Sequence, residues 1–128
     1  MNKSPGHQKF PEHKVQEQRV GKRMTVVIDG DIIADSNDVI CVDEDKNPLR
    51  YYFPRADVAM SRFVKSGTTT ECPFKGTAKY YSLIVGPQKL QDVVWTYDKP
   101  YDEHRELKGR LAFYDEKIPG IQVRQVDG

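Results

Sequence analysis

Residues 24–34 read MTVVIDGDIIA, and this stretch decides the class of fold. Two runs rich in β-branched residues flank Asp29 and Gly30. Aspartate and glycine tolerate the positive φ angles that a tight hairpin turn requires, so an Asp-Gly pair between two such runs is a strong hairpin signal. Short β-branched or aromatic runs separated by turn residues continue along the chain, which predicts an all-β domain.

Beyond this hairpin, the pattern of short apolar runs and turn residues predicts further strands and one helix. The further strands are expected at residues 39–42, 49–53, 78–85, 92–97, 109–114 and 121–124. Residues 57–67 (DVAMSRFVKSG) are expected to form a short helix, which Asp57 caps and Gly67 ends. About seven or eight short strands with one helix indicate two layers that cover each other's apolar faces, as in a compact β-sandwich or a partly open barrel.

The predicted all-β domain spans residues 24–128, because a chain of 128 residues suits one hydrophobic core. Residues 1–23 are expected to form a flexible arm, since Pro5, Gly6 and Pro11 stand among charged and amide side chains that cannot bury enough surface. The first residues lack the continuous apolar segment of a secretory signal, so we expect a cytoplasmic location.

The charges of the chain nearly cancel, with 20 Lys and Arg against 19 Asp and Glu and a formal net charge of +1. No global field attracts nucleic acid or anionic lipid, and the longest apolar runs are far shorter than a membrane span. We therefore expect neither a nucleic-acid nor a membrane partner. Cys41 and Cys72 are expected to be free thiols, because one bridge is a poor way to stabilise a domain of this size in a reducing compartment.

Residues 70–82 (TECPFKGTAKYYS) contain the candidate catalytic pair, Cys72 and Lys75. Pro73 and Gly76 suggest a tight turn, which would bring the ammonium group close enough to stabilise a Cys72 thiolate as a nucleophile. The structural alternative is that Cys72 is a small packing residue and that the Lys75 ammonium reaches solvent. Gly76 would then supply only the backbone conformation that begins a strand.

Six further side chains are candidates for ligand binding. The Arg55 guanidinium would grip a carboxylate or phosphate while Asp57 orients it; alternatively, Asp57 is a helix cap and Arg55 its neighbour. Aromatic residues on strands either line a pocket or fill the core. A histidine on the arm would add a general base, or is simply solvated. The aromatic candidates are Tyr80, Trp95 and Tyr97, and the histidine is His13.

Four blocks of uncommon residues occur in order: YFPR at 52–55 with DV at 57–58, CPFKG at 72–76 with Ala78, Tyr80 and Tyr81, WTY at 95–97 with Pro100, and Gly109 with LAFY at 111–114. In this combination the chain resembles the family called domain of unknown function 427, which is also labelled nucleotidyltransferase-like, over roughly residues 13–114. The resemblance implies a compact tent-like β-fold, related in outline to small domains that bind zinc or reduce methionine sulfoxide.

This resemblance suggests two sites, one for zinc and one for magnesium. Related domains hold structural zinc between two pairs of closely spaced cysteines, and this chain has no Cys-x-x-Cys pair, so we expect no metal and no cofactor. A nucleotidyltransferase needs paired carboxylates for magnesium. Asp29-Gly30-Asp31 has a suitable spacing, but it lies in the predicted hairpin turn, where both carboxylates would face solvent.

Three functions remain open from the sequence. The first is binding of an unknown small molecule in a pocket around the Cys-Pro-Phe-Lys-Gly loop. The second is a cysteine-dependent enzyme or a redox-responsive protein that uses Cys72. The third is a non-catalytic interaction module, in which an exposed sheet edge recruits a partner or a second copy to form a homodimer.

Overall fold

The computed structural model describes residues 3–126, and within them the chain is mainly β. The strands are β1 (Val15–Arg19), β2 (Met24–Ile28), β3 (Asp31–Ser36), β4 (Ile40–Glu44), β5 (Arg50–Tyr52), β6 (Phe63–Cys72), β7 (Gly76–Val85), β8 (Gln88–Tyr97), β9 (Leu111–Phe113) and β10 (Ile121–Gln125). A short α-helix, α1 (Pro5–Lys9), precedes them. The 3-10 helices η1 (Arg55–Asp57), η2 (Met60–Arg62), η3 (Asp102–Leu107) and η4 (Asp115–Lys117) lie in the connections.

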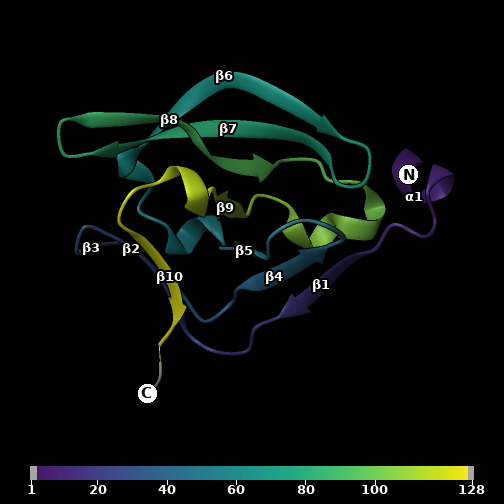
Figure 1. Cartoon of the computed structure of the whole chain (residues 1–128), viewed down its shortest axis with the longest axis horizontal. Coiled ribbons are helices and arrows are strands. Elements are labelled where there is room, and N and C mark those ends of the chain that lie inside the picture. Colours follow the sequence, from purple (N-terminus) through teal and green to yellow (C-terminus); the bar gives the residue numbers. More distant parts are fainter. Residues whose placement is uncertain (1–2, 127–128) are drawn as a thin grey trace.

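The strands form three antiparallel sheets with the orders β1-β4-β5, β10-β2-β3 and β6-β7-β8-β9. In Figure 1, β6, β7 and β8 form a layer across the top of the view, and β1, β4 and β5 lie below it. Every strand predicted from the sequence is present, as β2–β5 and β7–β10, so the mainly β class is confirmed. Within residues 3–126 no sheet closes into a barrel, and the layers are those of a sandwich.

The hairpin at residues 24–34 is formed as predicted. Asp29 and Gly30 have φ angles of 51° and 87°, and β2 pairs with β3 on either side of them. The Asp29 and Asp31 side chains are exposed, and an Asp31 carboxylate oxygen accepts a hydrogen bond of 3.3 Å from Arg62. The Asp-Gly-Asp segment is therefore a hairpin turn.

The helix predicted at residues 57–67 was wrong. This segment holds the end of η1, then η2, and then the start of β6, where Phe63 pairs with Leu83 of β7. The Asp57 carboxylate accepts a hydrogen bond of 2.6 Å from the Ser36 hydroxyl and does not cap a helix. A helix this short is marginal without strong packing, whereas the β-branched residues after Gly67 favour an extended chain that β7 can pair.

Residues 3–23 of the expected flexible arm are described, residues 1–2 lie outside the described range, and the expectation is corrected because much of residues 3–23 packs on the domain. Val15–Arg19 forms β1 and pairs with β4. The Gly6 amide and the Ser4 hydroxyl both donate to the Pro73 carbonyl, at 2.7 and 2.6 Å. Figure 1 shows α1 beside the turn that joins β6 and β7. The segment cannot form a core of its own, but the β4 edge and this turn supply the missing partners.

The buried apolar residues form two clusters that meet at β5. The larger cluster contains Phe53, Val94 and Leu111, and the smaller contains Tyr52 and Trp95. Tyr52 and Phe53 are consecutive yet belong to different clusters, because side chains alternate between the two faces of an extended chain. A cavity lies against the smaller cluster.

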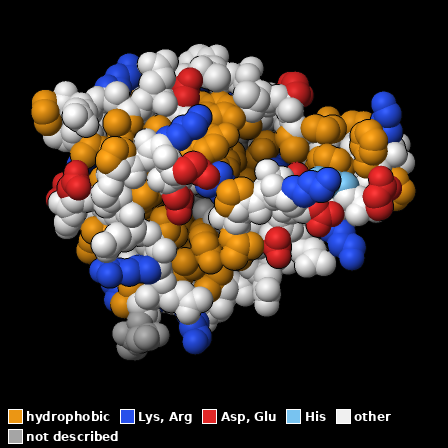
Figure 2. Space-filling view, in the orientation of Figure 1, with side chains coloured by type: hydrophobic (Ala, Val, Ile, Leu, Met, Phe, Trp, Pro, Cys, Tyr) orange, Lys and Arg blue, Asp and Glu red, His pale blue; other side chains and the backbone are white. Residues whose placement is uncertain are grey.

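The surface matches the balanced composition. On the face shown in Figure 2, acidic and basic side chains are interspersed, and hydrophobic side chains reach the surface between them. None of the helices in residues 3–126 is long and apolar enough to cross a bilayer.

Candidate functional site

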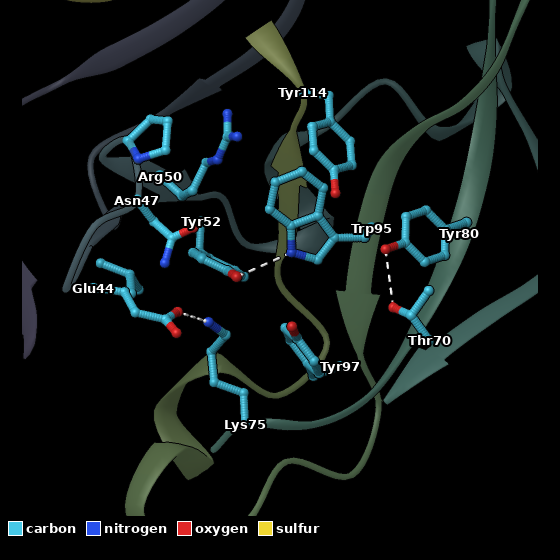
Figure 3. A pocket seen from close by; sticks show the side chains of 12 residues that line it. Glu44, Asn47, Arg50, Tyr52, Thr70, Lys75, Tyr80, Trp95, Tyr97 and Tyr114 are labelled. Carbon is cyan, nitrogen blue, oxygen red and sulfur yellow. Dashed lines mark hydrogen bonds and ion pairs between the residues drawn. The ribbon is translucent and has the colours of Figure 1, made fainter. Parts of the chain in front are cut away.

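A cavity of about 210 Å³ opens beside the turn at residues 72–76 (Figure 3). Its walls come from β4, β5, the loop between them, β6, the β6–β7 turn, β7, β8 and the residue after β9. The lining residues are Val42, Glu44, Asn47, Pro48, Arg50, Tyr52, Thr70, Lys75, Tyr80, Trp95, Tyr97 and Tyr114. Strands far apart in the sequence therefore build one concave site.

The aromatic wall of the cavity is held in place by its own contacts. Tyr80 and Trp95 face each other as a cross-strand pair of β7 and β8. The Trp95 indole N–H donates a hydrogen bond of 3.0 Å to the Tyr52 hydroxyl, inside the protein. The Tyr114 ring lies 4.5 Å from the Trp95 ring, measured between centroids. The predicted aromatic residues thus fill the smaller core cluster and line the cavity at once.

Lys75 is the buried cation of the site, with 7% of its surface exposed. Its ammonium group forms an ion pair with one carboxylate oxygen of Glu44, and His13 binds the other oxygen at 3.0 Å. The His13 ring is stacked on Phe74 at 4.1 Å. Gly76, with φ at 125°, follows in a conformation that side chains disfavour, so the turn depends on a glycine there.

The second cation of the site is Arg50, which lies against the aromatic wall. Its guanidinium donates two hydrogen bonds to the Glu116 carboxylate, at 2.7 and 3.0 Å. It also lies 5.4 Å from the Trp95 ring centroid and 5.1 Å from that of Tyr114. This combination of a bidentate ion pair and two ring contacts fixes the orientation of the guanidinium.

Burial shifts the pKa of the tyrosines around the cavity, and ion pairing decides that of Glu44. Burial raises the pKa of the Tyr52 and Tyr97 hydroxyls, so both remain protonated donors at neutral pH. Burial would also raise the pKa of Glu44, but the hydrogen bonds and charges of Lys75 and His13 outweigh it and lower that pKa. Glu44 is therefore an ionised acceptor whose two oxygens are both occupied.

Cys72, the predicted nucleophile, does not line the cavity. It pairs with Gly76 across the β6–β7 turn, is partly buried, and packs against the smaller core cluster. The ammonium group of Lys75, the predicted partner of Cys72, forms an ion pair with the Glu44 carboxylate. Cys41 and Cys72 are both free thiols.

Arg55 and Asp57 lie outside the cavity as well. The Arg55 guanidinium donates to the Tyr81 hydroxyl at 3.0 Å, and Asp57 binds Ser36. Of the predicted site residues, the fold thus brings Lys75, Tyr80, Trp95 and Tyr97 together and joins His13 to them through Glu44.

Eight of the twelve lining residues were not predicted as site residues from the sequence, and six of these eight have polar side chains. Alternation along the strands carries the missing signal: Glu44 shares a face of β4 with the buried Ile40 and Val42, and Arg50 shares a face of β5 with Tyr52. A charged residue on the buried face of a strand is informative, because such residues are rarely buried without a partner. The residues in question are Glu44, Asn47, Arg50, Tyr52, Thr70 and Tyr114.

In residues 3–126 no group of three or more His, Cys, Asp or Glu side chains is arranged to hold a metal ion.

Two comparisons with known proteins address the family of this chain. A search of curated proteins returned no match. A family model described as "Domain of unknown function (DUF427)" matches residues 16–124, a span that contains every lining residue of the cavity. The chain therefore belongs to the family of the domain of unknown function 427.

Proposed function

We propose that this protein binds a small, flat molecule that carries a carboxylate or carbonyl group, in the cavity lined by Lys75, Tyr52 and Tyr97. The observation that carries the proposal is a buried ammonium group in an aromatic-walled cavity. Aromatic walls favour flat ligands, because rings stack on them or meet them edge to face. The volume of about 210 Å³ suits a molecule of one or two rings.

The polar groups of the cavity favour an acceptor on the ligand. A lysine ammonium has several N–H donors, and Glu44 takes one. The Tyr52 oxygen accepts from Trp95, which leaves its own O–H to donate. In Figure 3 the Lys75 ammonium and the Tyr52 and Tyr97 hydroxyls face the same space.

Among the described residues of the cavity wall, the one carboxylate is already engaged. Both oxygens of the Glu44 carboxylate are engaged, one by Lys75 and the other by His13. The Tyr97 hydroxyl makes no hydrogen bond to any other residue of the 3–126 range. A ligand oxygen would satisfy these donors together, and a carboxylate would gain charge-assisted hydrogen bonds from Lys75.

The test is a thermal-shift and calorimetric comparison of matched ligand pairs, benzoate against benzyl alcohol and nicotinate against nicotinamide. We expect the carboxylates to bind more tightly than their uncharged partners. Lys75→Met should abolish this preference. Tyr97→Phe, which keeps the ring, should weaken carboxylate binding about three- to tenfold, the cost of one hydrogen bond.

Lys79→Met is the matched control, since Lys79 is exposed and pairs with Asp98 on the surface. It should leave binding unchanged. If Lys75→Met folds poorly because Glu44 loses its partner, Tyr97→Phe still tests the site. Equal carboxylate binding by wild type and both cavity variants, or no binding of any of these probes by the wild type, would refute the proposal.

A further inference from the structure

A second hollow, of about 450 Å³, lies between η1 and the chain from η3 to β9. It is lined by Pro54, Arg55, Arg105, Glu106, Lys108, Gly109 and Arg110. It shares no lining residue with the aromatic cavity, and nothing in the proposed function uses it. Arg55, a candidate for anion binding from the sequence, is part of its wall.

Positive charge gathers in this hollow. Its wall has four cationic side chains and one carboxylate, although the whole chain has a formal net charge of only +1. The carboxylate, on Glu106, lies 3.2 Å from Arg19, which is outside the hollow, so part of its charge is already compensated there. The field within the hollow is therefore positive, and a concave wall concentrates it.

Three of the cations have no acidic partner. Arg55, Arg105 and Lys108 form no ion pair within residues 3–126. All three residues are exposed. Unpaired cations around one concavity repel each other, and an anion placed between them removes that repulsion. The hollow thus has a charge that the protein itself leaves unneutralised.

Two of the guanidinium groups are held in position. Arg55 donates to the Tyr81 hydroxyl and lies 5.5 Å from the centroid of the Tyr81 ring. Arg110 is anchored by the Glu106 carbonyl at 2.9 Å and by an Asp38 carboxylate oxygen at 3.1 Å. Arginines that are fixed in advance lose less conformational entropy when they bind an oxyanion.

We propose that this hollow binds a phosphate group, with Arg55, Arg105 and Lys108 as its ligands and Arg110 as a fixed positive wall. A phosphate dianion carries several acceptor oxygens and matches the planar N–H forks of the arginines. Free phosphate and a small phosphate ester share this chemistry, and the experiment below separates them.

The experiment is a titration of the full chain, followed by ¹H–¹⁵N NMR at constant ionic strength, with sodium phosphate, phenyl phosphate or sodium chloride. We expect saturable shifts confined to the backbone amides near Arg55 and residues 105–110 with both phosphates. Chloride should produce none. Tighter binding of phenyl phosphate would identify an ester as the natural source, and tighter binding of inorganic phosphate would identify free phosphate.

The test variant is Arg105→Gln/Lys108→Gln, and the control is Lys65→Gln/Lys89→Gln, which removes the same charge from exposed positions on β6 and β8. The test variant should weaken phosphate binding at least about tenfold, as the loss of two charge-assisted contacts requires. The control should bind within about twofold of wild type. Non-saturable shifts, equal binding by the test variant, or binding of an oligonucleotide without binding of either phosphate would overturn the proposal.

Discussion

At the residue scale, histidines connect the N-terminal segment to the cavity. His7 and His104 face each other with their Nε2 atoms 2.8 Å apart, and the other nitrogen of His104 contacts Glu17. Only one of the two facing nitrogens can carry a proton in this contact, because two N–H groups would repel each other. His13 continues the connection through Glu44 to Lys75. The His7 and His13 rings both contact Phe74, in the turn that carries Lys75, so the N-terminal segment and the cavity share this turn.

Stability should fall as the pH is lowered from 7.5 to 5.5, and His7 should contribute to that fall. Burial, and then the neighbouring His104, lower the pKa of His7 below its ordinary value of 6.5. The nearby charges of Glu103 and Glu44 act in the opposite direction. Because the unfolded chain binds this proton more readily, the contribution is present above the unfolded pKa and is lost as the pH falls from there through the lower folded pKa.

The measurement is the urea midpoint of wild type and His7→Gln at both pH values. The wild type should lose more stability than the variant. Lys9→Gln, on the same helix, leaves every histidine in place and should follow the wild type. Parallel pH profiles for wild type and His7→Gln would show that this histidine has no such role.

At the element scale, α1 depends on a close backbone contact with the turn at residues 72–76. The Gly6 amide lies 2.7 Å from the Pro73 carbonyl, and a Cβ atom at Gly6 would lie 2.7 Å from that oxygen and 2.8 Å from a ring carbon of Phe74. Gly6→Ala should therefore displace the helix and destabilise the protein by about 1–3 kcal/mol, as overpacking typically does. Faster amide hydrogen exchange at residues 72–76 would accompany the loss.

Gly67→Ala is the matched control, since no heavy atom beyond its chain neighbours lies within 4 Å of a Cβ at Gly67 and its φ is not positive. It should change the free energy of unfolding by no more than about 0.5 kcal/mol. Unchanged stability and exchange in Gly6→Ala would mean that α1 does not protect the turn.

At the scale of the whole molecule, Phe53 joins the layers. Its amide and carbonyl exchange hydrogen bonds with Leu111 at 2.9 and 2.8 Å, which links the chain after β5 to β9 of the four-stranded sheet. Its side chain is fully buried in the larger cluster, while the preceding Tyr52 lies in the smaller one. The two clusters should therefore unfold together.

Phe53→Leu tests this coupling. The variant should be destabilised by about 1–2 kcal/mol, less than the loss for a Phe to Ala change. Trp95 fluorescence reports on the smaller cluster and the Met24 methyl NMR signal on the larger, and both midpoints should move by the same amount. Phe10→Leu, at an exposed position, should leave both midpoints unchanged. Two separated transitions would show that the clusters are independent.

The sequence alone determined the local structure wherever one pattern dominated. The Asp29-Gly30 turn and the β-branched or aromatic runs at residues 78–85 and 92–97 act over a few residues, so they predicted strands and turns correctly. Local patterns failed where two states compete: Asp57, Phe63 and Val64 suit a short helix, but pairing with β7 supplies more hydrogen bonds than a marginal helix retains.

Only the tertiary structure decided which side chains share a site. The residues CPFKG at 72–76 suggested a Cys72–Lys75 pair, yet the pairing of β4 with β1 and β5 places Glu44 where Lys75 can reach it. Arg55 was separated from Lys75 and joined to Arg105 and Lys108 instead. The physical reason is that turn chemistry and strand alternation are local, whereas a cavity is formed by strands paired across long sequence distances, and no short pattern encodes that pairing.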